Sequence, residues 1–460
     1  MALRFRTLDF KVPVSLVLLF LSNPLHARAF SPELHLGAEA QVYRNTVTPS
    51  FFPILNFGIN AESSQDPGNP VQATSEYKFQ ADFRISPTHP KAFAITGPNL
   101  YYGDQLQDTF LRFAVGRKLM GWSKLDEMWG LGEFEPLNSW DRLRSSPQGL
   151  TGLFAYTETD IVNLRFFASY LYLPEFTPNN VIENNHFVLE HPQAISTAPQ
   201  TFTLLNRPTP LGYELAIPSI DKIILRPSVA FSIESKRENP IYAKFSYGYL
   251  PLNYFPIALQ AALAIPIDTI IVELRPRLIQ HHLYNAEVTY NISESVTSGL
   301  VLMVNDPISD QIPLDYTTTP LSTSYSASPW VQVELPQVKI VLTHLRTWKG
   351  LEADVGENAN PQTSIFSSRV LYRNASQLKL RYLLSPKRLH YIEAKYLHEY
   401  SINADWLAAD LIIYLKSNLS FLIGGDVINA ERTVSGERGA EFLADVRALD
   451  RIRVGVQYVF

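Results

Sequence analysis

Apolar and polar residues alternate along most of the chain after residue 34. In EYKFQADFRIS (76–86) every second residue is apolar, and the same alternation recurs in IYAKFSYGY (241–249) and LYNAEVTYNI (283–292). A period of two is the period of a β-strand with one apolar face. Further strands are predicted at 34–43, 53–62, 109–117, 161–172, 222–233, 268–278, 296–304, 338–346, 364–373, 377–385, 389–398, 406–415, 418–427, 437–446 and 451–460.

The length of these strands separates two kinds of all-β protein. Strands of soluble sheets run about 5–6 residues, whereas a barrel in lipid needs about 9–11 residues per strand, with aromatic residues at the ends of its apolar band. Most of the predicted strands are of the longer kind, and Tyr77, Tyr247 and Tyr249 lie near strand ends. The sequence therefore predicts a transmembrane antiparallel β-barrel. We expect 18 strands, with 16 the next choice, because even numbers are the rule for such barrels.

The first residues have the features of an export signal. Arg4, Arg6 and Lys11 accompany a short apolar run at 12–21, and Ala27 and Ala29 form a cleavage pattern. The apolar run is too short for a membrane span of about 20 residues. We therefore expect a signal peptide at 1–29 and a single barrel domain at 30–460.

Composition excludes several classes of protein. The chain has no cysteine, which rules out a lipoprotein anchor and a disulfide framework. Its formal net charge is only −5, so nothing points to nucleic acid as a partner. No cofactor is implied. The 26 Phe, 23 Tyr and 6 Trp fit strands and membrane interfaces.

Charged residues of both signs occur in the middle of the polar strand faces. In a closed barrel these side chains face the interior, where water solvates them and opposite charges pair across strands. A soluble sheet could expose the same residues, so they support the barrel only together with strand length and export. The lumen candidates from strands are Asp82, Arg84, Arg165, Glu273, Arg275 and Arg277. Charged residues also occur in the middle of polar strand faces at Lys244, Glu287, Lys379, Arg381, Glu393, Lys395, Arg451 and Arg453.

Long connections of such barrels face outward and short turns face the periplasm. The predicted long connections are 63–75, 118–148, 173–219, 305–327 and 347–363. The longest of them is rich in Pro and Asn, which favours a loop outside the barrel or folded into its lumen.

Segment 116–154 breaks the period of two. Within SKLDEMWG, Ser123 is a possible helix N-cap and Gly130 a possible stop, which predicts a short helix. One interpretation is a constriction loop whose charges select solutes. The alternative is a structural plug or a solvated surface loop. The constriction candidates are Arg117, Lys118, Lys124, Asp126, Glu127, Glu133, Glu135, Asp141, Arg142 and Arg144.

Catalytic and metal sites have little support. His281, His282, His344, His390 and His398 lie near strand ends without a nucleophile elbow or an equivalent partner. The acidic segments 305–315 and 351–358 lack the ligand spacing of a calcium loop. We expect neither an enzyme nor a metal site.

The end of the chain carries a family resemblance. Residues 30–460, with a final strand in which Val454, Val456, Tyr458 and Phe460 alternate, resemble Gram-negative outer-membrane β-barrels. The resemblance implies that this strand is read by the barrel assembly machinery. Segment 116–154 also resembles a stretch of porin-like families, matching them at Gly116, Arg117, Trp129, Gly130, Asn138 and Asp141.

Three functions follow from the barrel. The first is a porin-like channel in the outer membrane that passes small solutes through a charged lumen. The second is a barrel plugged by its loops, acting as a surface receptor, an adhesin or a capsule-associated structural protein. The third, an exporter of an acidic polysaccharide, requires a strongly basic lumen, and the mixed charges weaken it. Lipid and the assembly machinery are the expected partners, and the solute and oligomeric state stay open.

Overall fold

The fold is that of a computed structural model. It describes residues 32–44, 50–62, 75–105, 110–159, 161–177, 180–189, 191, 200–204, 206–236, 240–264, 269–308, 316–318, 321–351, 370–385, 390–430 and 442–460. The predicted signal peptide (1–29) and most of the acidic segment 351–358 lie outside these residues. None of the helices in the described part of the chain is long and apolar enough to cross a membrane.

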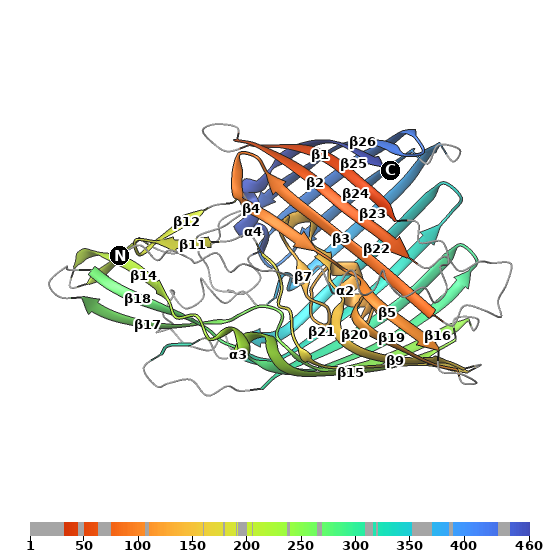
Figure 1. Ribbon diagram of the computed structural model, residues 1–460, viewed down its shortest axis with the longest axis horizontal. Helices are drawn as coiled ribbons and strands as arrows, with labels where there is room; N and C mark the ends of the chain where they lie inside the picture. Colours follow the sequence, from red (N-terminus) through yellow and green to blue (C-terminus); the bar gives the residue numbers. More distant parts are fainter. Residues whose placement is uncertain are drawn as a thin grey trace, which may run out of the picture.

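One antiparallel sheet closes on itself as a barrel (Figure 1). It contains 19 strands, of which β4 and β5 both pair with β3 and share one position, so the wall has 18 positions. The predicted fold class and the predicted strand number are confirmed. The wall strands are β1 (Glu33–Tyr43), β2 (Ser50–Glu62), β3 (Ser75–Ser86), β4 (His89–Thr96), β5 (Leu100–Gln105), β6 (Leu111–Lys118), β9 (Leu150–Glu158), β10 (Val162–Leu171), β15 (Leu225–Ser235), β16 (Ile241–Pro251), β19 (Gln280–Ser293), β20 (Val296–Pro307), β21 (Leu321–Glu334), β22 (Val338–Leu351), β23 (Asn374–Ser385), β24 (His390–Glu399), β25 (Ala404–Lys416), β26 (Leu419–Ala430) and β27 (Arg451–Val459).

The last strand closes the wall by pairing with the first. β27 runs antiparallel to both β26 and β1, with Val456 opposite Ala38. Its side chains alternate as the sequence predicts, because Ile452 is 62% exposed on the outside while Arg451 is 3% exposed inside. Exposed Leu, Val, Ile, Phe and Tyr side chains continue on the outward faces of the other wall strands. A closed wall with an apolar exterior is the form of a barrel that sits in lipid.

Short turns lie at one end of the barrel and long connections at the other. The short end holds the turns between β19 and β20, β21 and β22, and β25 and β26, together with the chain end near Phe460. The other end carries the connections 119–149, 172–224 and 252–279 (Figure 1). The strands that flank the predicted long connection 63–75 meet at the short-turn end, which is opposite to the prediction, and residues 63–74 lie outside the described part of the chain.

A small sheet projects beyond the long-connection end (Figure 1). β14 (Arg207–Leu215) pairs with β13 (Thr201–Leu204) and, in parallel, with β18 (Thr269–Pro276), which also pairs with β17 (Ile257–Ala264). Beside it lies the hairpin of β11 (Asn180–Glu183) and β12 (His186–Leu189), while the short helix α3 (Ile220–Ile224) contacts the wall strand β15. The predicted wall strand 268–278 therefore belongs to this projecting sheet. It alternates like a wall strand because Leu274 packs against Leu211 and Tyr213 in a small core.

Two more predicted wall strands are wrong. Residues 442–446 form the helix α4 (Phe442–Val446), continued by η3 (Arg447–Leu449), and the described part of 364–373, residues 370–373, is not a strand. Three wall positions were not predicted, namely β4 with β5, β9 and β21. The predicted total of 18 is right because the three predicted strands that are not part of the wall are balanced by the three wall positions that were not predicted.

Candidate functional site

The connection between β6 and β9 folds into the barrel rather than away from it. It contains α2 (Lys124–Trp129), β7 (Leu137–Asn138), η1 (Arg142–Arg144) and β8 (Ser146–Pro147). We call residues 119–149 the inner loop. The predicted helix is present, because the Ser123 side chain accepts hydrogen bonds from the amides of Leu125 and Asp126, and Gly130 ends the helix with φ 63°.

The start of α2 is bonded to the inner face of the wall. The Ser123 hydroxyl donates to Asn285 on β19 at 3.0 Å, and the Lys124 amide donates to the Glu287 carboxylate at 2.7 Å. The indole of Trp129 donates to Ser328 on β21 at 3.0 Å. Because all three partners lie on inward-facing positions, the helix lies in the lumen.

The end of α2 is held by a third part of the wall. Lys379 and Gln377, both on β23, donate to the backbone carbonyl of Met128 at 2.7 and 3.2 Å. A cation at this position also complements the negative end of the helix dipole. The helix is thus fixed between β19, β21 and β23.

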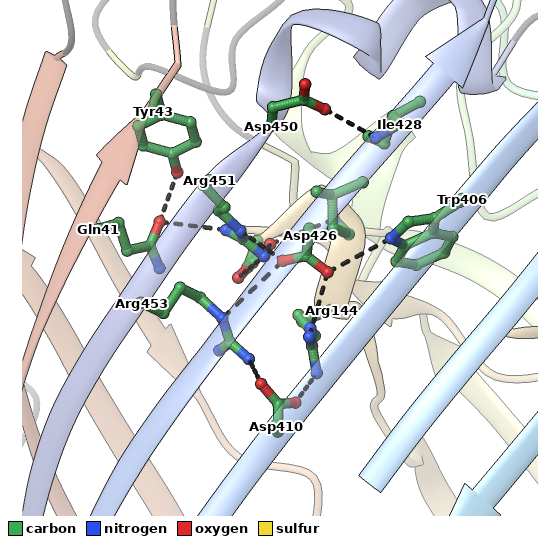
Figure 2. A network of polar contacts seen from close by, with 12 residues as sticks. Gln41, Tyr43, Arg144, Trp406, Asp410, Asp426, Ile428, Asp450, Arg451 and Arg453 are labelled. Carbon is green, nitrogen blue, oxygen red and sulfur yellow. Dashed lines mark hydrogen bonds and ion pairs between the residues drawn. The ribbon is translucent and has the colours of Figure 1, made fainter.

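The far end of the inner loop is bonded to the wall strands β25, β26 and β27 (Figure 2). Arg451 on β27 is buried between Asp141 of the loop at 2.9 Å and Asp426 on β26 at 2.7 Å. Arg144 of the loop reaches Asp426 at 3.1 Å and also contacts Asp410 on β25. These contacts join the loop to three neighbouring strands.

Groups of opposite charge are neighbours throughout this network. Arg453 donates to Asp410 at 2.5 Å and lies 3.6 Å from Glu39, so that three arginines face three aspartates and one glutamate. Gly424, opposite Asp410, leaves the space that the carboxylate occupies, because a Cβ there would overlap it. Paired and hydrogen-bonded charges are the form in which ionised groups are tolerated when buried.

Two predicted constriction acids stabilise the loop itself. Asp126 accepts from the amides of Glu133 and Phe134 at 3.2 and 2.8 Å, and Glu135 accepts from the amides of Met120 and Gly121 at 2.8 and 3.3 Å. Burial, together with the nearby Glu133, raises the pKa of Asp126 to about 8, and burial raises the pKa of Glu135 to about 7. These carboxyl groups are structural rather than lumen-lining.

The pKa of Asp141 is shifted in the opposite direction. Burial alone would raise the pKa of this carboxyl group, but the Arg451 guanidinium outweighs burial and lowers the pKa to about 2. Asp141 therefore stays ionised at neutral pH and keeps its contact with the wall.

Other charged groups of the lumen face solvent. On the inner loop, Lys124 pairs with Glu127 at 3.0 Å, with both side chains more than a third exposed. On the wall, Arg381 faces Glu393 at 3.6 Å, and each is about half exposed. Side chains of both signs are thus exposed in the interior.

Two lysines lie opposite each other near the end of α2. Lys379 on β23 pairs in register with Lys395 on β24, on the inward face. The Lys395 ammonium lies 3.8 Å from the ring centroid of Trp406, which is a cation–π contact. Like charges directly opposite each other destabilise a sheet, and the Met128 carbonyl and the Trp406 ring are the contacts that compensate Lys379 and Lys395.

The remaining predicted residues that point inward lie either on the wall or on the inner loop. Lys118 bonds Glu76 at 3.0 Å, and Arg165 bonds Glu234 at 3.0 Å, both on the inner wall. Glu133 accepts from Asn305 at 2.5 Å, and Arg142 lies 5.9 Å from the Phe442 ring. Inward-facing wall positions also hold Asp82 and Arg84, since their register partners on β2 are Gly58 and Asn56.

Besides the role given to Asp126 and Glu135, four predictions are wrong. Arg117 stands opposite Leu100 and Thr151, on the outward face of the wall, and bonds the Gly149 carbonyl at 3.0 Å. Glu273, Arg275 and Arg277 belong to the projecting sheet or the residues just after it. Asp410 and Asp426 were not predicted, because a single acidic residue in an apolar strand does not indicate which residue it pairs with. In the described part of the chain, no three His, Asp or Glu side chains are grouped to hold a metal ion.

Comparisons with known proteins bear on the fold. No protein-family model matches the sequence, and no curated protein matches it significantly. Among solved structures, Pseudomonas aeruginosa OccK2 (OpdF) in complex with glucuronate is similar over 94% of this chain and 98% of that chain, with TM-score 0.50 and 10% identity. The chain has a porin-like barrel fold. A BenF-like porin from Pseudomonas fluorescens Pf-5 is also similar, over 94% of this porin-like barrel and 99% of its own chain, with TM-score 0.49 and 9% identity.

Proposed function

We propose that this protein is an outer-membrane channel through which small solutes pass passively. The observation that carries the proposal is the inner loop, which crosses a closed barrel and presents exposed charged groups to its lumen. Rings and clusters of charged side chains are how pores select among solutes. The BenF-like porin is named as a porin, which agrees with this reading.

The lumen of the proposed channel carries basic and acidic side chains. Lys379 and Lys395 form one side of the constriction, while the pair Lys124 and Glu127 lies on the inner loop. We infer that solutes are sorted by size and by charge at this level. The other inward-facing candidates, Asp82, Arg84 and Arg165, tune the field along the wall.

Export and assembly form part of the same proposal. Residues 1–29 serve as the signal peptide, and the final strand serves as the signal for the barrel assembly machinery. Lipid surrounds the apolar exterior. We propose no enzymatic activity and no cofactor.

A plugged barrel is the second candidate function. It is favoured by the dense bonding of the inner loop, in which Arg451 and Asp141 are buried together. In that case the projecting sheet of β13, β14, β17 and β18 would act as a receptor or adhesin surface.

Planar-bilayer recording of the purified protein distinguishes the open channel from the plugged barrel. The channel predicts discrete conductance steps from the wild-type protein. A silent wild type, together with an R451Q variant that conducts because its loop is released, would establish the plug. Silence of both would overturn the channel.

A further inference from the structure

Exposed apolar side chains continue beyond the wall onto the segment that joins it to the projecting sheet. We call residues 215–225 the foot; its helix α3 lies where β15 leaves the wall (Figure 1). Leu215, Ile217 and Ile220 are 45%, 65% and 72% exposed, and Leu225 at the start of β15 is 58% exposed. A contiguous group of exposed apolar side chains marks a surface that contacts a protein, a ligand or a membrane.

The foot is continuous with the lipid-facing side of the wall. Side chains alternate along a strand, so Leu225 lies on the same outward face of β15 as the exposed residues Val229, Phe231 and Ile233. Its register partner on β10 is Leu171, which is also exposed. Because the apolar exterior of a barrel wall contacts lipid chains, the surface that leads to the foot is a lipid-contacting one.

Backbone hydrogen bonds fix the two ends of the foot. The Tyr172 amide donates to the Ile224 carbonyl at 2.8 Å, which extends the pairing of β10 with β15 by one residue. At the other end the Ala216 amide donates to the Leu274 carbonyl on β18 at 2.9 Å. The foot is therefore bonded to the wall on one side and to the projecting sheet on the other.

The helix within the foot is amphipathic. Ile220, Ile223 and Ile224 have the i, i+3, i+4 spacing of one helix face. Asp221 and Lys222 are exposed and follow other directions around the helix axis. Amphipathic helices at membranes lie in the interface, with the apolar face toward the acyl chains and the polar face toward water.

A tyrosine lies beside the foot. Tyr170 is 75% exposed near the end of β10, one residue before Leu171. Tyrosine is enriched where a protein crosses the membrane–water interface, because its ring is apolar and its hydroxyl is polar. Its position agrees with an interfacial location for the neighbouring foot.

We propose that the foot inserts into the interface of the surrounding membrane and anchors the projecting sheet on lipid. Ile217, Ile220 and Leu225 contact acyl chains next to the headgroups, in continuation of the lipid-facing wall. The projecting sheet is thereby held at a fixed position over the end of the barrel. The proposal does not depend on whether the lumen conducts.

A single label tests where the foot lies. The chain has no cysteine, so one introduced cysteine carries a fluorescent bimane at a chosen position. Labelled I220C is reconstituted into phosphatidylcholine vesicles that contain a lipid with a nitroxide near the ester end of an acyl chain. V229C, on the lipid-facing side of β15, is the control for lipid contact. T203C is the control for water contact, because Thr203 is exposed on β13, opposite Pro208 at the end of β14 away from Leu215.

The proposal predicts that the nitroxide lipid quenches the label at position 220 about as strongly as at position 229, and several-fold more strongly than at position 203. Iodide in the water is expected to quench the three labels in the reverse order. Strong quenching by iodide at position 220, without quenching by the nitroxide lipid, would mean that the foot lies in water and would overturn the proposal.

A second pair of variants tests whether the foot acts as the anchor. I217N/I220N removes two apolar side chains from the foot, and the matched control V188N/F202N removes two exposed apolar side chains from the parts beyond it. With the label on L215C, quenching by the nitroxide lipid is expected to fall several-fold in I217N/I220N and to stay unchanged in the control.

Two outcomes of this second experiment contradict the anchor. Equal quenching in I217N/I220N and in the control would show that the isoleucines do not hold the foot in lipid. If light scattering in detergent shows a dimer that I217N/I220N dissociates, a second copy of the chain covers the foot in place of lipid.

Discussion

Lys379 of β23 and Lys395 of β24 stand directly opposite each other on the inner face of the wall, beside the end of α2. Only Lys379 is bonded to the inner loop, through the Met128 carbonyl. Lys395 instead lies over Trp406. The two side chains therefore lie beside the inner loop, where replacing one of them tests the path of permeating ions.

Replacing Lys395 with glutamine is expected to shift the channel toward cations. The substitution removes one positive charge next to the constriction while leaving the Lys379 bond to the loop intact. The reversal potential in a KCl gradient measures the effect, and K395Q moves it toward the cation equilibrium potential. K222Q, which removes the same charge from α3 outside the lumen, is expected to match the wild type. A reversal potential unchanged in K395Q would place the permeation path elsewhere.

Breaking the buried network is expected to release one end of the inner loop. R451Q removes the cation paired with buried Asp141 and one of the cations around Asp426, and removal of one partner of such a buried pair costs about 3–5 kcal/mol. We expect a lower midpoint of thermal unfolding and new tryptic cleavage at Arg142 and Arg144.

K78Q is the matched control for that experiment. Lys78 pairs with Glu62 at 3.0 Å, but both side chains are partly exposed, and such pairs contribute about 0–1 kcal/mol. Its thermal midpoint is expected to stay close to the wild type. If R451Q changed neither the midpoint of thermal unfolding nor the tryptic cleavage, the network would not hold the loop.

Packing of the inner loop is expected to weaken as pH rises. The pKa of Glu135 is about 7 in the folded loop against an ordinary 4.5, so the folded form binds the proton more tightly than the released form. The penalty for ionising this buried group is absent below pH 4.5, grows as pH rises to about 7, and is then constant. Asp126, with a pKa of about 8, extends the loss to higher pH.

Tryptophan emission reports that change, because Trp122, Trp129 and Trp140 are buried in the loop. We expect a red shift and easier acrylamide quenching at pH 8 than at pH 5. In E135Q the amide oxygen keeps both backbone hydrogen bonds, and the change between pH 4.5 and 7 becomes smaller, because of the two carboxyl groups only Asp126 still contributes to it. Identical pH profiles for E135Q and the wild type would contradict the role of Glu135.

The sequence was sufficient to predict the wall but not every strand in it. Alternation marks any sheet with one buried and one wet or lipid-facing side, so β18 of the projecting sheet has the same pattern as a wall strand. The wall strand β21, LSTSYSASPWVQVE, hides its pattern in serines and Pro329. The wall position that β4 and β5 share is interrupted at Gly97 and Pro98.

The candidate site was predicted at the level of the segment and not of each side chain. Charges in a loop that breaks the alternation indicate polar contacts, and the structure places the loop in the lumen. Whether an acid lines the lumen or bonds its own backbone depends on the loop conformation, which alternation does not encode. Asp126 and Glu135 were therefore assigned the wrong role, while Lys124 and Glu127 are exposed as predicted.

The last strand is expected to be required for assembly, as the resemblance to outer-membrane barrels implies. Tyr458 and Phe460 stack edge to face with centroids 4.6 Å apart, and Phe460 is largely exposed at the short-turn end. Replacing both with alanine keeps the backbone bond from Phe460 to Leu34 available, so the finished wall loses little. We expect export to continue and the folded, heat-modifiable form in the outer-membrane fraction to fall several-fold. I452A, on the same outward face in the middle of the apolar band, is expected to assemble like the wild type. Normal membrane levels of the double variant would show that the terminal aromatic pair is not the feature that the assembly machinery reads.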